Sequence, residues 1–335
     1  MFELHQHKTQ ALFFKPSFER LEDRIKKAAP DLDIYLIDEN GRFTHQGEEV
    51  TRDKLHPDYF WIHSELFFSP ILKTYFKLMS ECRDVKWLHT VNTGLDKGPY
   101  LELLHHGVRI TNNHSQAIAI AEYVMAHVLS WFQKLPDYVQ KQSERSWKYR
   151  PFREIHQTRW LILGFGHIGH QIARRAKAFG IHITAVRRGK SDDGLADEVV
   201  RIDNMQESLQ AADVVILACA SNDSTRNIVN KDFLAQMKTD SVLVNIARGD
   251  LVVEDDLKVA LDAGIPAHAI LDVFNKEPLP EDSWIWQHPS ISLTPHCSNG
   301  GSGMRKRSDE LFLENLNRIS NGQLLLNEVS EKDIL

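Results

Sequence analysis

The chain has 335 residues, which predicts two domains at about 150 residues per domain. Hydrophobic residues make up 42% of the chain and charged residues 26%, a balance that excludes disordered, collagen-like and coiled-coil proteins. The net charge of −6 argues against a general nucleic-acid-binding protein, because such a protein presents a basic face to phosphates.

The N-terminal third alternates short apolar runs with helical patterns. Such alternation predicts a parallel sheet with crossover helices. The expected strands are Ala11–Phe14, Leu32–Ile37, Tyr59–His63 and Val85–Val91. The expected helices are Phe18–Ala28 and Ile71–Cys82.

A strongly helical pattern covers Ala117–Phe132, where apolar residues recur at helical spacing. At about 1.5 Å per residue, such a helix is long enough to cross between two domains. A polar and aromatic stretch, 134–153, follows it. A last amphipathic helix is expected at Arg305–Ser320.

Strand and helix patterns then alternate again through the second half of the chain. The expected strands are Arg159–Leu163, Ile181–Val186, Asp213–Ala218, Ser241–Ile246, Ala267–Asp272 and Ile291–Thr294. Helical patterns lie between them, for example at Glu254–Ala263, which Gly264 closes.

A glycine pattern directly follows the first of these strands and opens a helix. We expect Gly164 to allow a tight turn, Gly166 to let a pyrophosphate approach the backbone, and Gly169 to pack the helix against the strand. The backbone N–H groups around His167 and Ile168 would then face the phosphates. The turn predicts a dinucleotide site; the alternative is an ordinary strand-to-helix turn that needs glycines.

The end of the next strand predicts which dinucleotide binds. NAD enzymes place Asp or Glu here, on the ribose 2′-OH. This chain has Arg187 and Arg188, followed by Gly189, Lys190 and Ser191. Guanidinium groups bind a 2′-phosphate through charge-assisted hydrogen bonds, so we expect NADP(H) as the preferred cofactor and NAD(H) as the second choice. A solvated basic loop is the alternative.

Three polar residues follow strands in the second half: Arg248, Glu277 and His296. In open α/β sheets, ligands bind beyond the carboxyl ends of strands. Arg248 suits a substrate carboxylate and can polarise the adjacent carbonyl. His296 can exchange a proton with the reacting oxygen, and Glu277 can orient that imidazole. Together they predict catalysis of hydride transfer to a 2-oxo acid.

These motifs resemble those of the D-isomer-specific 2-hydroxyacid dehydrogenase family. The resemblance runs from about Val91 to Asn315 and is carried by several segments: Val91–Asp96, Thr111-Asn112, GFGHIG at 164–169, NIARGDLV at 245–252, LDVFNKEPLP at 271–280 and TPHCSNGG at 294–301. It implies a catalytic set of Arg248, Glu277 and His296. It also implies that Asp272 contacts the nicotinamide carboxamide.

The resemblance further implies two doubly wound parallel-sheet α/β domains. A discontinuous, flavodoxin-like substrate-binding domain would comprise 1–113 and 299–335, and a Rossmann dinucleotide-binding domain 114–298. Substrate would bind in the cleft, with its carboxylate held by the loop Asn92-Thr93-Gly94 and by Arg248. A homodimer built mainly from cofactor domains is implied as well.

The basic cluster at Arg187 and the Trp286-Gln287-His288-Pro289 stretch resemble the NADP-dependent glyoxylate/hydroxypyruvate reductase branch. We therefore expect a reductase of small 2-oxo acids. One alternative is a non-catalytic dinucleotide sensor that resembles corepressors of the family. Another is a dehydrogenase of a different small oxyanion, such as phosphite.

Cysteine use and the absence of long apolar runs indicate the compartment. Three cysteines without a CxxC pair predict neither a disulfide framework nor a structural zinc site, and no metal site is expected. The first residues lack a secretory pattern, and the longest apolar runs are strand-length. We expect a soluble cytoplasmic protein without membrane or nucleic-acid partners.

Overall fold

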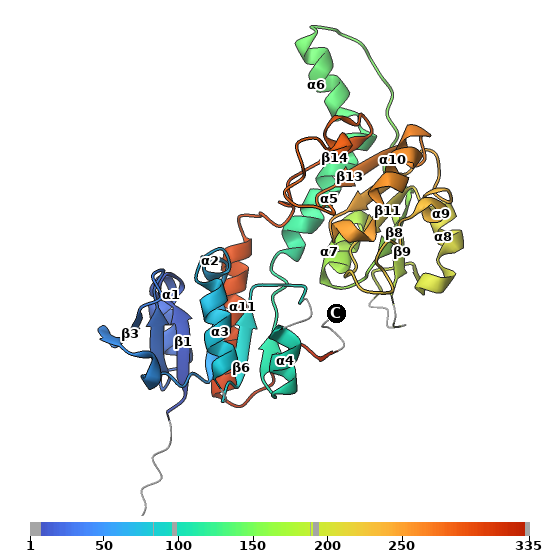
Figure 1. Ribbon diagram of the computed structural model, residues 1–335. Helices are drawn as coiled ribbons and strands as arrows, with labels where there is room; N and C mark the ends of the chain where they lie inside the picture. Colours follow the sequence, from blue (N-terminus) through green and yellow to red (C-terminus); the bar gives the residue numbers. More distant parts are fainter. Residues whose placement is uncertain (1–7, 83, 96–98, 188, 190–193, 332–335) are drawn as a thin grey trace, which may run out of the picture. The chain divides into compact units, whose positions relative to one another are not determined.

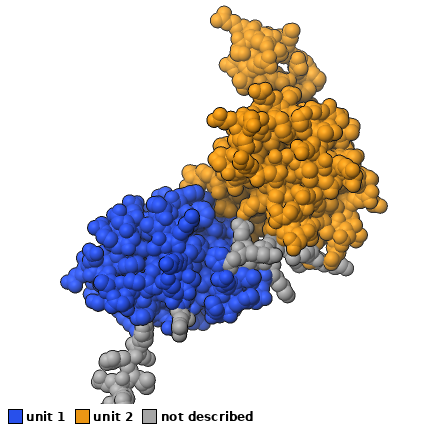
Figure 2. Space-filling model, viewed as in Figure 1, with its two compact units in different colours: residues 1–115, 303–335 blue, residues 116–302 orange. Residues whose placement is uncertain are grey.

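Alternating strands and helices build two separate seven-stranded sheets in the computed structural model. The structure describes residues 8–82, 84–95, 99–187, 189 and 194–331. Unit 1 comprises Met1–Ser115 and Gly303–Leu335, and unit 2 comprises Gln116–Ser302 (Figure 2). The observed divisions, after residues 115 and 302, lie a few residues C-terminal to the predicted domain boundaries, after residues 113 and 298. Arg307 Nε donates to the Ser115 carbonyl at 2.9 Å, which ties that residue to unit 1.

Unit 1 contains a parallel sheet with an antiparallel extension. Its strands are β1 (Gln10–Phe14), β2 (Asp33–Ile37), β3 (Phe43–His45), β4 (Glu48–Val50), β5 (Tyr59–Ile62), β6 (Trp87–Thr90) and β7 (Arg109–Thr111). The parallel part has the order β2-β1-β5-β6-β7, which is the strand order of flavodoxin-like folds. The flavodoxin-like prediction is therefore confirmed. The antiparallel β3 and β4 were not predicted.

Helices cover both faces of the unit 1 sheet (Figure 1). They are α1 (Lys15–Ala28), α2 (Ser64–Phe67), α3 (Leu72–Glu81), α4 (Pro99–His105) and α11 (Met304–Ser320), with a short 3-10 helix η1 (Arg52–Lys54). The apolar faces of α1 and α11 form one core, which includes the stacked rings of Trp61 and Phe312. The helices α3 and α4 pack on the other face.

Unit 2 has an all-parallel sheet. Its strands are β8 (Arg159–Leu163), β9 (His182–Val186), β10 (Glu198–Val200), β11 (Val214–Leu217), β12 (Val242–Asn245), β13 (His268–Leu271) and β14 (Ile291–Leu293). Their order is β10-β9-β8-β11-β12-β13-β14. This is the dinucleotide-binding order 3-2-1-4-5-6 with one strand added, so the Rossmann prediction is confirmed.

Both faces of the unit 2 sheet are buried beneath helices. In β8, Trp160 and Ile162 face one core, and Leu161 and Leu163 face the other, as expected when side chains alternate along a strand. The first core is covered by α5 (Ala117–Phe132) and α7 (His167–Lys177). The second is covered by α8 (Gln206–Ala211), α9 (Lys231–Leu234) and α10 (Glu254–Asp262). The described part of unit 2 also contains the 3-10 helices η2 (Ile202–Asn204), η3 (Gly249–Leu251) and η4 (Trp284–Gln287).

A helix and an extended segment project from the body of unit 2 after α5 (Figure 1). The helix, α6 (Leu135–Ser143), occupies part of the stretch in which the sequence suggested no element. Val139, Trp147 and Tyr149 are exposed there. Among the described residues, no helix has the length and apolar character needed to span a membrane.

Candidate functional site

The glycine turn joins β8 to α7 and brings them against the neighbouring strand end. Gly164 has a φ of +95°, which disfavours any residue with a side chain. A Cβ built on it would lie 2.5 Å from the backbone of Cys219, which follows β11. A Cβ on Gly169 would lie 2.6 Å from the Gly164 carbonyl oxygen. Both glycines therefore permit close backbone packing.

Gly166 differs, because a Cβ built on it would meet nothing within 4 Å. Gly166 is also the N-cap of α7 and provides no side-chain cap. The first turn, with His167 and Ile168, thus presents backbone N–H groups beside open space, and such a helix end favours anions. Partial desolvation, with a smaller contribution from His170, lowers the pKa of His167, so its imidazole is mostly neutral at pH 7. This turn fits a pyrophosphate.

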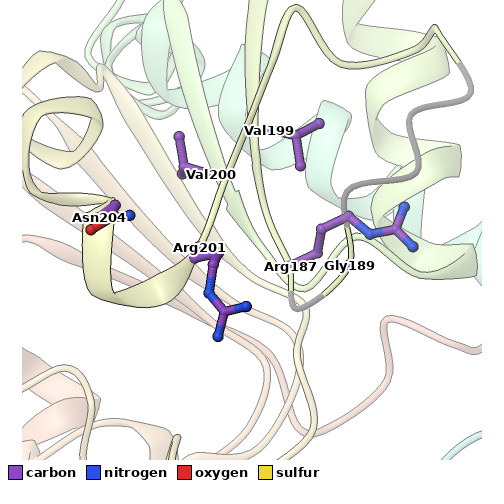
Figure 3. A pocket seen from close by; sticks show the side chains of 6 residues that line it. All are labelled: Arg187, Gly189, Val199, Val200, Arg201 and Asn204. Atoms are coloured by element: carbon purple, nitrogen blue, oxygen red, sulfur yellow. The ribbon is translucent and has the colours of Figure 1, made fainter.

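The end of β9 carries the residues predicted to select the cofactor. Arg187 is half-buried and lines a cavity of about 210 Å³ together with Gly189 (Figure 3). Arg188, Lys190 and Ser191 lie outside the described residues. The cavity also brings in Arg201, which the sequence did not indicate. This edge fits the adenosine end of a dinucleotide, since the glycine turn lies one strand away.

The adjacent strands β12, β13 and β14 lie on the other side of β8 from β9 in the same sheet. A predicted site residue follows the carboxyl end of each of these strands. Arg248 follows β12, Asp272 follows β13 and His296 follows β14. These strands pair with one another in parallel, so their carboxyl ends meet at one edge. The structure therefore brings these residues together within unit 2.

The loop that carries Arg248 is held by side-chain and backbone contacts. Asn245 Nδ2 donates to the Arg248 carbonyl at 2.8 Å, and Asn245 Oδ1 accepts from the Ala247 N–H at 3.1 Å. A Cβ on Gly249 would overlap the Phe274 carbonyl, so the glycine lets this loop contact the backbone of the next one. The Arg248 side chain remains exposed, where it can meet an anionic ligand.

Glu277 and His296 form the shortest polar contact of the predicted catalytic set. Glu277 Oε2 lies 2.7 Å from His296 Nδ1. Glu277 Oε1 accepts from the Phe274 N–H at 2.9 Å, which fixes the carboxylate. An acceptor at Nδ1 leaves the Nε2 atom of the imidazole for a ligand. The pair can therefore deliver or accept a proton at Nε2.

Asp272 is fully buried behind this pair. One carboxylate oxygen accepts from Thr294 Oγ1 at 2.6 Å and from the Cys297 N–H at 2.9 Å; the other accepts from the Ser298 N–H at 3.0 Å. The Tyr123 hydroxyl lies 2.7 Å from Thr294 Oγ1. Asp272 thus holds the loop on both sides of His296, and its second oxygen retains acceptor capacity.

The loop Asn92-Thr93-Gly94 lies in unit 1, after β6. Thr93 Oγ1 donates to the Asn113 carbonyl at 2.6 Å, and Asn112 Nδ2 donates to the Thr93 carbonyl at 2.9 Å. Asn92 Nδ2 donates to the Tyr100 hydroxyl at 3.1 Å. These bonds order the loop, and Gly94 remains exposed.

Sequence reasoning missed the residues that support the site. Asn245 and Gly249 flank Arg248 in the motif NIARGD. Their position beside this charged residue could have identified them as residues that support its loop. Tyr123 lies more than a hundred residues from Thr294 in the chain, and no local pattern connects the two. Their contact comes from the packing of α5 in unit 2.

Comparisons with known proteins agree with this geometry. A family model described as "D-isomer specific 2-hydroxyacid dehydrogenase, NAD binding domain" matches residues 125–298. A relative from Corynebacterium melassecola, named as an uncharacterized protein in the proB 3′ region, is 36% identical over 193 residues. That match covers 55% of this chain and 63% of the relative, so it spans less than two thirds of the relative's length.

Solved structures match over nearly the whole chain. A D-isomer specific 2-hydroxyacid dehydrogenase family protein from Aeromonas salmonicida has a TM-score of 0.76 at 25% identity, covering 96% of this chain and 99% of that one. One from Xanthobacter autotrophicus, in complex with NADPH and MES, has a TM-score of 0.76 at 23% identity, with coverage of 97% and 99%. An NADPH-dependent glyoxylate/hydroxypyruvate reductase from Sinorhizobium meliloti, in complex with NADP and sulfate, scores 0.74 at 22% identity, with coverage of 97% and 99%. The last two share the fold.

Proposed function

Because the chain belongs to the D-isomer specific 2-hydroxyacid dehydrogenase family, we propose that it reduces a small 2-oxo acid to the D-2-hydroxy acid with NADP(H). The substrate class is that of glyoxylate and hydroxypyruvate. The observation that carries the proposal is the His296–Glu277 contact of 2.7 Å, on the sheet edge that also presents Arg248. The glycine turn of the same unit supports dinucleotide binding.

The proposed chemistry needs a cation, a proton donor and a hydride. When bound, the reduced nicotinamide supplies the hydride to the carbonyl carbon. Arg248 binds the substrate carboxylate and polarises the carbonyl. His296 Nε2 gives its proton to the oxygen that becomes the hydroxyl, and the imidazole then takes a proton from solvent. Glu277 keeps the imidazole oriented for this transfer.

The cofactor contacts follow from the strand-end positions. The N–H groups around Gly166, His167 and Ile168 would hold the pyrophosphate, and Arg187 with Arg188 would hold the 2′-phosphate. The family resemblance would assign the carboxamide N–H to Asp272, whose carboxylate is buried here and accepts from Thr294, Cys297 and Ser298. The Xanthobacter and Sinorhizobium structures contain NADPH and NADP, which supports the proposed preference for NADP(H) over NAD(H) by analogy of fold.

Unit 1 supplies the remaining substrate contacts in this proposal. The ordered loop at Asn92, Thr93 and Gly94 would offer backbone N–H groups to the substrate carboxylate. We also propose a homodimer, in which the exposed apolar side chains of Leu135, Val139 and Trp147 meet a second copy of the chain. Burying such side chains is favourable, by roughly 1.5 to 3 kcal/mol each.

Initial rates test the function. The purified chain is given glyoxylate or hydroxypyruvate with NADPH or NADH, and the nicotinamide absorbance is followed. We expect turnover with NADPH well above that with NADH. His296→Ala is the matched control, since it leaves the glycine turn untouched. A panel of 2-oxo acids that gives no oxidation above this control would contradict the proposal, even if the chain binds the cofactor.

A further inference from the structure

Two arginines occupy equivalent positions at the ends of neighbouring strands. The parallel strands β9 and β10 pair Val186 with Val200, and the next residues are Arg187 and Arg201. The Arg187 N–H donates to the Val200 carbonyl at 3.1 Å, which extends the ladder past the strand end. Because paired strands lie about 4.8 Å apart, the two side chains start one strand spacing from each other.

Both arginines line the cavity of about 210 Å³ at this edge (Figure 3). The full lining is Arg187, Gly189, Val199, Val200, Arg201 and Asn204. Val199 and Val200 contribute apolar atoms to the lining, and the guanidinium groups and the Asn204 amide contribute donors. Within the described part of the chain, no carboxylate lines this cavity, whereas an NAD site has Asp or Glu at this place.

Arg201 differs from the ion-paired arginines of unit 2; Arg174 likewise has no acidic partner within the described part of the chain, but of the two only Arg201 lines the cavity. Arg153 pairs with Asp213 and Asp240, and Arg226 pairs with Asp250. For Arg201, the structure records no acidic partner among residues 8–82, 84–95, 99–187, 189 and 194–331. Its guanidinium therefore keeps its donors available for a ligand.

Resting on the proposed NADP(H) function, we propose that Arg201 is a specificity-determining residue that binds the 2′-phosphate of the cofactor together with Arg187. The strand order leads to this assignment. The pyrophosphate turn follows β8, and β9 and β10 lie successively outward from it, so the adenosine ribose extends toward the β9–β10 edge. Two guanidiniums there match the double charge of a phosphate monoester.

The test compares Arg201→Gln with Arg201→Lys and with Arg174→Gln. Arg174 is an exposed arginine in the last turn of α7, so its substitution removes the same charge from the same unit. Dissociation constants for NADPH and NADH are measured by fluorescence titration, and those for 2′-AMP, 5′-AMP and inorganic phosphate by competition. We expect Arg201→Gln to lower the NADPH-to-NADH affinity ratio roughly 10- to 100-fold, the effect of losing a charge-assisted hydrogen bond.

The other variants should bracket that result. Arg201→Lys should retain part of the ratio, and Arg174→Gln should leave it unchanged. The wild type should prefer 2′-AMP to both 5′-AMP and inorganic phosphate, and Arg201→Gln should lose that preference. Equal weakening of NADPH and NADH, or no change in either, would overturn the inference. A wild-type chain that binds neither cofactor would instead overturn the proposed function.

Discussion

Each unit places a histidine beside a carboxylate within three residues of a strand's end, but the two histidines differ in access to solvent. In unit 1, His63 follows β5; its side chain is 1% exposed, between Asp309 at 3.3 Å and Glu65 at 3.4 Å. In unit 2, His296 follows β14; its side chain is 46% exposed and lies 2.7 Å from Glu277. The same chemical pair can therefore support the fold or face a substrate, and burial decides between the two roles.

The contacts around His63 and Asp309 support a structural role for this buried pair. Arg20 pairs with Asp309 and with Glu65, and Ser17 Oγ donates to Glu65 at 2.7 Å. Burial raises the pKa of Asp309, but hydrogen bonds from His63 and Arg20 outweigh it and hold the pKa below its usual value. The ionised carboxylate is therefore part of the folded unit 1.

The largest expected effect comes from removing the exposed imidazole. His296→Gln should lower kcat/KM by roughly 10² to 10⁴-fold, the usual contribution of a general acid. Thermal unfolding should change little, because the side chain is half exposed. The matched variant His63→Gln should do the reverse and lower the melting temperature. If His63→Gln lost as much activity at unchanged stability, the comparison would be wrong.

Removing the buried carboxylate should have the next largest effect. Asp309→Asn removes the nearer of the two carboxylates that pair with Arg20 and leaves only Glu65 at 3.6 Å, and we expect the free energy of unfolding to fall by about 3 kcal/mol. Chemical denaturation measures this loss. Glu277→Gln is the matched change in the exposed pair and should cost less than about 1 kcal/mol. Equal losses in the two variants would show that burial does not separate the pairs.

Acid should destabilise both units through buried neutral histidines. Burial lowers the pKa of His89 in unit 1 to about 3 and that of His268 in unit 2 to about 4, from an ordinary 6.5. The unfolded chain therefore takes up these protons first as the pH falls. The free energy of unfolding should decrease from pH 6.5 downward, by up to about 1.4 kcal/mol per pH unit for each histidine.

Denaturation at pH 7.0, 5.5 and 4.5 checks this dependence. His268→Gln removes the group from unit 2 alone, so the loss of stability with falling pH should be shallower in that variant. The contribution of His89 should remain. A variant with the same pH slope as the wild type would contradict the assignment of a neutral buried His268.

The smallest expected effect tests the support behind the exposed pair. Burial raises the pKa of Tyr123, so its hydroxyl stays protonated beside Thr294, which in turn donates to Asp272. Tyr123→Phe should lower the free energy of unfolding by about 1 kcal/mol, the usual value of one hydrogen bond. Unchanged stability would show that the Thr294–Asp272 bond orders the loop without Tyr123.

Local patterns predicted the parts of the fold that depend on neighbouring residues. The expected strand at Arg159–Leu163 and the expected helix at Ala117–Phe132 have the same bounds as β8 and α5, because both are apolar segments that are largely buried. By contrast, α6 was missed. It has no buried residue, so no buried face distinguishes this helix in the sequence. The hairpin of β3 and β4 was missed because each strand has only three residues.

The sequence by itself determined the order of strands and helices, the glycine turn, and the chemical types of Arg248, Glu277 and His296, because each depends on residues adjacent in the chain. Only the tertiary structure decided which of these residues meet. The pairing of β12, β13 and β14 brings the loops of Arg248, Asp272 and His296 to one sheet edge, and the pairing of β9 and β10 places Arg201 beside Arg187. Strand pairing joins residues distant in sequence, so no local pattern encodes these contacts.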